Sequence, residues 1–150
     1  MFKIEFAHIS VASLSFQLPA GFILLDPEEP HVNSTLSLQS PDGSYLITVS
    51  LDRSENTSDA ELRSILSEGG YCVLAPVSPF TRNGVSGHSA AYLSGKRGYW
   101  ELRLDLPADD PSGPNTLVFQ ISTHWGRGIL TLMDAQPLQS LLKSIQPLCQ

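Results

Sequence analysis

The sequence predicts an α+β fold, in which a central antiparallel β-sheet carries helices packed on its faces as an α/β/α sandwich. Several segments alternate apolar and polar residues with a period of two, as half-buried strands do. Two other segments place apolar residues at helical spacing. The chain has 150 residues, 41% of them hydrophobic, with 11 glycines and 11 prolines to supply turns. This length suits one core, so we expect a single domain over residues 1–150.

Four strands are expected in the first third of the chain. Residues 2–6 and 14–18 alternate apolar with polar side chains. Residues 35–39 and 45–51 alternate again on either side of Asp42-Gly43, a dipeptide typical of β-hairpin loops. With that loop, the aliphatic side chains of the two strands share one face. The facing pairs are then Leu36 with Val49 and Leu38 with Ile47.

Two helices are expected in addition. Ser58 and Glu61 have the spacing of a capping box, in which each side chain accepts from the other's backbone amide, and Gly69-Gly70 ends this helix. Near the C-terminus, Pro137 suits a first helical turn. The apolar stripe of the second helix is Leu138, Leu141, Leu142 and Ile145. Residues 128–133 fit both a strand and a helical turn.

A second hairpin is expected over residues 85–105. A strand over residues 117–121 then follows a turn-rich linker, residues 107–114. The simplest loop for the hairpin is Lys96-Arg97, between two glycines. The core face then pairs Leu93 with Trp100 and Ala91 with Leu102. The outer face pairs His88 with Asp105, Ala90 with Arg103 and Tyr92 with Glu101.

The order of these segments resembles that of the PsbP/Mog-type family, small bacterial members included. The segments that carry the resemblance are FQLPAGF, SPDGSYLITVSL, TSDAELRSIL, VSGHSAAYL and LLKSIQ. Family members resemble one another in a central antiparallel sheet with helices on its faces. They include a photosystem accessory protein, a nuclear-import factor, bacterial lipoproteins and chaperones of secreted toxins. The resemblance therefore implies a binding module rather than an enzyme, and it implies no functional residue, because the matching positions are structural.

Charge and hydropathy exclude several classes of function. The net charge is −6 and the nine basic residues are scattered, so we expect no nucleic-acid partner. The longest apolar runs fall far short of the ~20 residues of a membrane-spanning helix, so no membrane span is expected. Charged and polar residues interrupt residues 1–19, which predicts a cytoplasmic protein without a secretory signal. The histidines and cysteines lack metal-site spacing, so we expect neither metal nor cofactor.

Aromatic and charged residues of the second hairpin and the strand after it are the candidate binding residues. Trp, Tyr and Arg are enriched at the hot spots of protein interfaces. The candidates are Tyr92, Glu101, Arg103, Trp125 and Arg127. Gln120, Ser122 and His124 of a neighbouring strand extend the polar face of the hairpin. The leading hypothesis is a non-enzymatic protein-binding module, an adaptor, chaperone or accessory factor, which uses a sheet face or edge. Its protein partner is unidentified, and no catalytic residue is expected.

Two alternatives stay open. A histidine oriented by a carboxylate is a typical general base, so a pair of His88 and Asp105 near a serine predicts a small-molecule hydrolase or transferase. The acidic net charge also suits an immunity-type protein that neutralises a basic toxin. An enzyme needs the pair inside a concave pocket with a perturbed histidine pKa, whereas a binding module needs an exposed apolar or aromatic patch.

Overall fold

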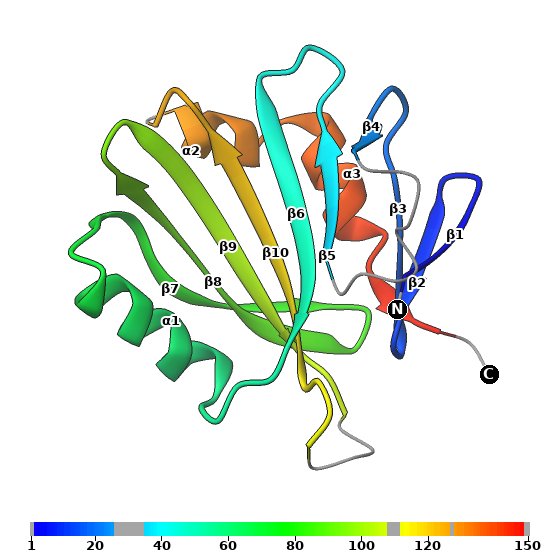
Figure 1. Ribbon diagram of the computed structural model, residues 1–150, viewed down its shortest axis with the longest axis horizontal. Coiled ribbons are helices and arrows are strands. Elements are labelled where there is room, and N and C mark those ends of the chain that lie inside the picture. The colour runs from blue at the N-terminus through cyan, green and yellow to red at the C-terminus, as the bar shows by residue number, and fades with distance from the viewer. Residues whose placement is uncertain (1, 26–34, 108–111, 127, 149–150) are drawn as a thin grey trace.

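Two antiparallel β-sheets make up most of the molecule in the computed structural model, which describes residues 2–25, 35–107, 112–126 and 128–148 (Figure 1). Strands account for 51% of the structure and helices for 19%. The expected α/β/α sandwich is therefore wrong. The described chain has only three short helices, and residues expected as loops form strands of both sheets.

The larger sheet has seven strands in the order β4-β5-β6-β10-β9-β8-β7, and neighbouring strands are antiparallel. The strands are β4 (Ile23–Leu25), β5 (Thr35–Gln39), β6 (Tyr45–Asp52), β7 (Cys72–Arg82), β8 (Val85–Ser94), β9 (Arg97–Asp105) and β10 (Thr116–Thr123). Because β10 lies between β6 and β9, the last long strand of the chain is the middle of the sheet.

The smaller sheet combines both ends of the described chain. It consists of β1 (Phe2–Glu5), β2 (His8–Val11), β3 (Leu14–Gln17) and β11 (Gln146–Pro147), in the order β1-β2-β3-β11. The sequence did not indicate β2, because its two tight turns contain no glycine or asparagine. Phe6 and Ala12 take the positive φ angles of these turns instead, 57° and 52°.

The core lies between the two sheets. Phe16 of β3 and Phe119 of β10 meet edge to face there, with ring centroids 5.1 Å apart. Two C-terminal helices close the core, α2 (Gly128–Met133) and α3 (Gln136–Lys143). The expected second helix is confirmed, and residues 128–133 are helical. The apolar stripe expected for the C-terminal helix is buried throughout, namely Leu138, Leu141, Leu142 and Ile145.

The opposite face of the large sheet carries α1 (Ser58–Glu68), which packs on β7, β8 and β9. The helix and its end before Gly69 are confirmed, but the expected capping box is wrong. Thr57 is the N-cap residue, without a side-chain cap. The Ser58 hydroxyl instead lies 2.7 Å from His88 Nδ1, and the Glu61 carboxylate accepts from Asn56 at 3.0 Å.

The register of the first hairpin is confirmed, whereas the second hairpin is shifted by two residues. Leu38 faces Ile47 and Leu36 faces Val49, as expected. In the second hairpin Ser94 pairs with Arg97, so Gly95-Lys96 is the loop. Gly95 has a φ of 63°, a conformation that glycine adopts without steric cost. A shift by two keeps each side chain on its expected face but changes every partner.

The edge strand β7 contains two prolines, Pro76 and Pro79. Proline is compatible with an edge strand, where one side of the backbone has no partner strand. Irregularities in the pairing between Val73 and Ser78 accommodate the first of these prolines. Of the turn-rich linker expected over residues 107–114, residues 108–111 lie outside the described residues.

The contact between the sheets yields a stability prediction. We expect Phe119→Ala to lower the free energy of unfolding by about 3–5 kcal/mol, because a fully buried ring is lost. A double-mutant cycle with Phe16→Ala, measured by urea denaturation, should show a coupling energy of about 1 kcal/mol. Additive effects of the two substitutions would contradict direct contact between the rings.

Candidate functional site

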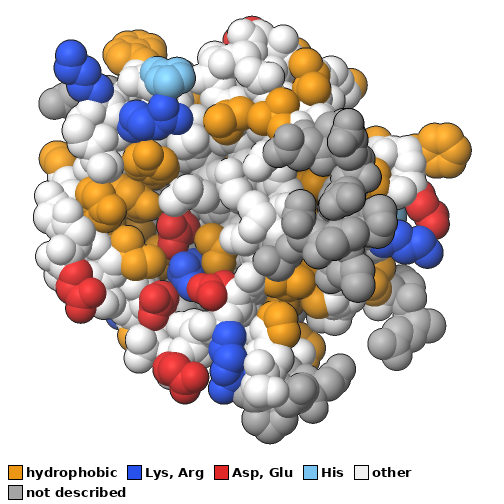
Figure 2. Space-filling view, viewed as in Figure 1, with side chains coloured by type: hydrophobic (Ala, Val, Ile, Leu, Met, Phe, Trp, Pro, Cys, Tyr) orange, Lys and Arg blue, Asp and Glu red, His pale blue; other side chains and the backbone are white. Residues whose placement is uncertain are grey.

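Three of the predicted binding residues form a buried network on the outer face of the large sheet. Arg103 is 5% exposed, and it donates from Nη1 to Glu101 Oε2 at 3.1 Å and from Nη2 to Asp52 Oδ2 at 2.7 Å. The Tyr92 hydroxyl donates to Glu101 Oε1 at 3.4 Å, and the Gln120 amide donates to the same oxygen at 3.3 Å. Figure 2 shows acidic and basic side chains gathered beside α1.

Aromatic side chains close one side of this network. Tyr71, Tyr92 and Tyr99 form a stack with centroid distances of 4.7 and 5.3 Å. Burial raises the pKa of the Tyr92 hydroxyl, and the neighbouring Glu101 carboxylate raises it further. Tyr92 therefore remains protonated and can donate to Glu101. Since these charged groups bind one another, the network stabilises the sheet face and leaves little of itself for a partner.

Trp125 lies away from this network, two residues after the end of β10, and 75% of it is exposed. A glycine-rich turn holds it. Gly126 N donates to Lys96 O at 2.8 Å, and Gly128 N donates to Trp125 O at 2.9 Å. A Cβ atom on Gly98 would lie 2.1 Å from Gly126 O, so only glycine permits this approach between β9 and the turn. The backbone that carries the exposed indole is therefore tightly packed.

A cavity of about 330 Å³ opens beside Trp125. The β5–β6 loop, the end of β10 and α2 form it, and its lining includes Ser44, Thr123, Trp125, Thr131 and Leu132. A concave site with an aromatic wall and few polar groups is typical of a binding pocket. The exposed indole and the cavity thus form one continuous surface.

Charged groups border this cavity. Arg97 Nη1 lies 3.1 Å from His124 Nδ1, and because a guanidinium can only donate, His124 Nδ1 accepts. Lys96 is exposed in the adjacent hairpin loop. On the other side of the cavity, the Asp42 carboxylate accepts a hydrogen bond from the hydroxyl of Ser44, a lining residue, at 2.7 Å. We define the Trp125 surface as Lys96, Arg97, His124, Trp125 and the adjoining cavity. In Figure 2 a histidine lies against basic and hydrophobic side chains at one edge of the molecule.

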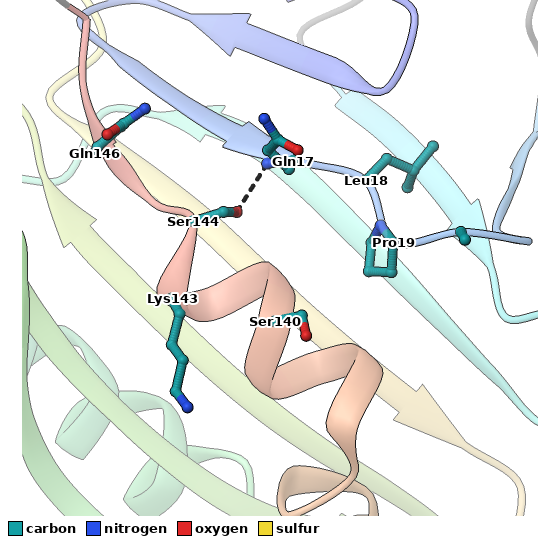
Figure 3. Close-up of a pocket in the computed structure, with 8 residues that line it drawn as sticks. Gln17, Leu18, Pro19, Ser140, Lys143, Ser144 and Gln146 are labelled. Carbon is teal, nitrogen blue, oxygen red and sulfur yellow. Dashed lines mark hydrogen bonds between the residues drawn. The ribbon is translucent and has the colours of Figure 1, made fainter.

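A second cavity of about 480 Å³ lies between the end of β3 and α3 (Figure 3). Its polar lining already takes part in bonds within the chain, since Ser144 Oγ accepts from Gln17 N at 2.8 Å. Gln17, Ser140 and Lys143 on its rim are exposed. Although this cavity is the larger one, it has no aromatic wall, so the Trp125 surface is the better candidate.

The expected pairing of His88 with Asp105 is wrong. His88 faces Arg103 across the hairpin, and Asp105 faces Thr116 of β10. The loop at Gly95-Lys96 causes this difference. His88 instead contacts Ser58, whose side chain is buried in the first turn of α1. A serine and a histidine in contact suggest nucleophilic chemistry, but this hydroxyl is not accessible to a substrate.

The structure thus separates the predicted residues. Tyr92, Glu101 and Arg103 form the buried network, Trp125 belongs to the Trp125 surface, and Arg127 lies outside the described residues. The sequence did not indicate that Asp52 pairs with Arg103 or that Arg97 contacts His124. Asp52 reaches Arg103 only through the strand order β6-β10-β9, which adjacent segments of the sequence do not indicate.

No family model matches the chain and no curated protein matches it, so the resemblance to the PsbP/Mog-type family stays a prediction. Within the described ranges, no helix has the length and apolar character needed to cross a membrane. The described side chains also include no group of three or more His, Cys, Asp or Glu residues placed to hold a metal ion.

The buried network yields a second stability prediction. Arg103→Ala should lower the free energy of unfolding by about 3–5 kcal/mol, because it leaves Glu101 buried without its cation. The matched control is Arg63→Ala, which breaks an exposed pair with Asp59 and should cost less than about 0.5 kcal/mol. Urea denaturation measures both, and equal costs would contradict a buried network.

Asp42 yields a prediction about pH. Hydrogen bonds, first from the Ser44 side chain and then from the Ser44 backbone and the Ser40 hydroxyl, lower the pKa of Asp42 from 3.8 to about 2. A lowered pKa stabilises the folded state above pH 3.8, and this contribution disappears as the pH falls to about 2. The stability difference between wild type and Asp42→Asn should therefore vanish over this window in denaturant titrations. A difference that does not change with pH would contradict the hydrogen bonds.

Proposed function

We propose that the protein is a non-enzymatic binding module that contacts a protein partner through the Trp125 surface. One observation carries this proposal: an indole that is 75% exposed is held by a tightly packed turn beside a cavity of about 330 Å³. Exposed tryptophan beside a preformed pocket is typical of the anchor residues of protein interfaces. A role as adaptor, chaperone or accessory factor is compatible with such a surface.

The sheet edge supports binding less well than the Trp125 surface does. The edge strand β7 contains two prolines and irregular pairing, features that discourage the addition of a further strand. The hydrolase alternative has lost the His88–Asp105 pair on which it depended. The immunity alternative rests on net charge alone. A cytoplasmic location stays the prediction of the sequence.

Affinity capture with matched variants tests the proposal. Isotope-labelled, tagged protein serves as bait in a lysate of the organism that encodes it, and mass spectrometry then distinguishes bait from captured chains. Trp125→Ala should weaken binding of the partner about 30-fold or more, as expected for a hot-spot residue worth about 2 kcal/mol. Trp125→Phe should retain part of the binding.

Leu148→Ala is the control, because Leu148 is an exposed apolar residue that follows β11 of the small sheet, away from the Trp125 surface (Figure 1). This variant should capture the partner as wild type does. Circular dichroism verifies that all variants are folded. If Trp125→Ala and wild type capture the same chains equally well, the Trp125 surface is not the binding site.

A further inference from the structure

A second unusual hydrophobic group lies at the tip of the β1–β2 hairpin. Phe6 is the most exposed large hydrophobic residue of the described chain, with a relative exposure of 103%. Its φ of 57° falls in the left-handed region, which is unfavourable for a bulky residue. Glycine or asparagine would suit this turn better. The fold of a single chain therefore gains nothing from a phenylalanine here, which suggests that Phe6 contacts another molecule.

The hairpin presents Phe6 in a defined position. Glu5 pairs with His8 across the ladder directly behind the two-residue turn, so the turn is short and its direction is fixed. The side chain of Glu5 is 65% exposed and lies 3.2 Å from Lys3 Nζ. Phe6 is thus an apolar projection beside the exposed ion pair of Lys3 and Glu5.

The cavity of the Trp125 surface is complementary to this projection. Its volume of about 330 Å³ exceeds the ~150 Å³ that suffices to bind benzene in a protein interior. Trp125 and Leu132 offer apolar contacts to an aromatic ring. Arg97, which lies 3.1 Å from His124 of the cavity lining, and the exposed Lys96 beside it supply positive charge at one side of the cavity. There the carboxylate of Glu5 can exchange its exposed pairing with Lys3 for a pairing with these cations.

Phe6 and the cavity lie on opposite sides of the molecule, since Figure 1 places the β1–β2 hairpin far from the end of β10 and α2. The chain cannot fill its own cavity with Phe6, but a second copy can. We propose that Phe6 of one copy inserts beside Trp125 of another, with Glu5 directed toward Lys96 and Arg97. This inference rests on the proposed function, because it names the partner of the Trp125 surface as a second copy of the chain.

The contact is heterologous, so it joins copies head to tail and leaves a free Phe6 at one end and a free cavity at the other. Association should therefore continue beyond the dimer as concentration rises. This property separates the proposal from a symmetric dimer, which closes after two copies.

Sedimentation velocity with complementary variants tests the proposal. Wild type should form species larger than a dimer with rising concentration, whereas Phe6→Ala and Trp125→Ala alone should each remain monomeric. Phe6→Ala retains the cavity and Trp125→Ala retains the projection, so an equimolar mixture should form one productive contact per pair. The mixture should therefore contain dimers and nothing larger. Restoration by mixing also shows that both variants are folded.

A charge exchange provides a second test. Glu5→Arg and Arg97→Glu should each weaken association, and mixing the two should recover part of it if these side chains pair. The proposal is overturned if wild type remains monomeric at all concentrations, or if the mixture of Phe6→Ala and Trp125→Ala stays monomeric. If wild type is monomeric while capture of another protein still depends on Trp125, this inference fails and the proposed function stands.

Discussion

The packing of β3 against β10 determines how the two sheets and the segments that follow them are placed. Phe16 packs on Phe119 and joins the small sheet to the middle strand of the large one. This contact fixes which face of β10 is buried against the small sheet and which carries the polar network. The same strand ends at Thr123, two residues before Trp125, so the position of the exposed indole follows from the packing of the two sheets.

The middle strands carry different chemistry on their two faces. The inner face is aliphatic and aromatic, whereas the outer face holds Arg103 between Glu101 and Asp52 beneath α1 and a row of tyrosines. Because these charges are already paired, the outer face contributes to the stability of the fold. The surface available to a partner is instead formed where the β5–β6 loop, α2 and the turn after β10 meet. Gly98 allows that turn to lie against β9.

Local signals predicted the strands around Asp42-Gly43 and the C-terminal helix correctly, because a short loop and a regular apolar stripe each determine one structure. They failed where alternation fits two registers and where the decisive contact is not local. The predicted register of the second hairpin was wrong by two residues, because the alternation of apolar and polar residues is the same in both registers. The positive φ of Gly95 is what places the loop at Gly95-Lys96. Trp125 could be chosen from its residue type and its place at a strand end. The cavity beside it could not, since its walls come from segments far apart in the chain.

One of the two tryptophans is buried in the core, while the other is held in solvent beside the cavity. Fluorine NMR of protein labelled with fluorotryptophan tests it directly, in dilute solution and with Trp125→Phe for assignment. Exchanging H₂O for D₂O should shift the resonance of Trp125, which is 75% exposed, and leave that of Trp100, which is 8% exposed, nearly unchanged. Equal shifts, or a shift at Trp100 alone, would contradict both the packing of the large sheet and the binding surface that we assign.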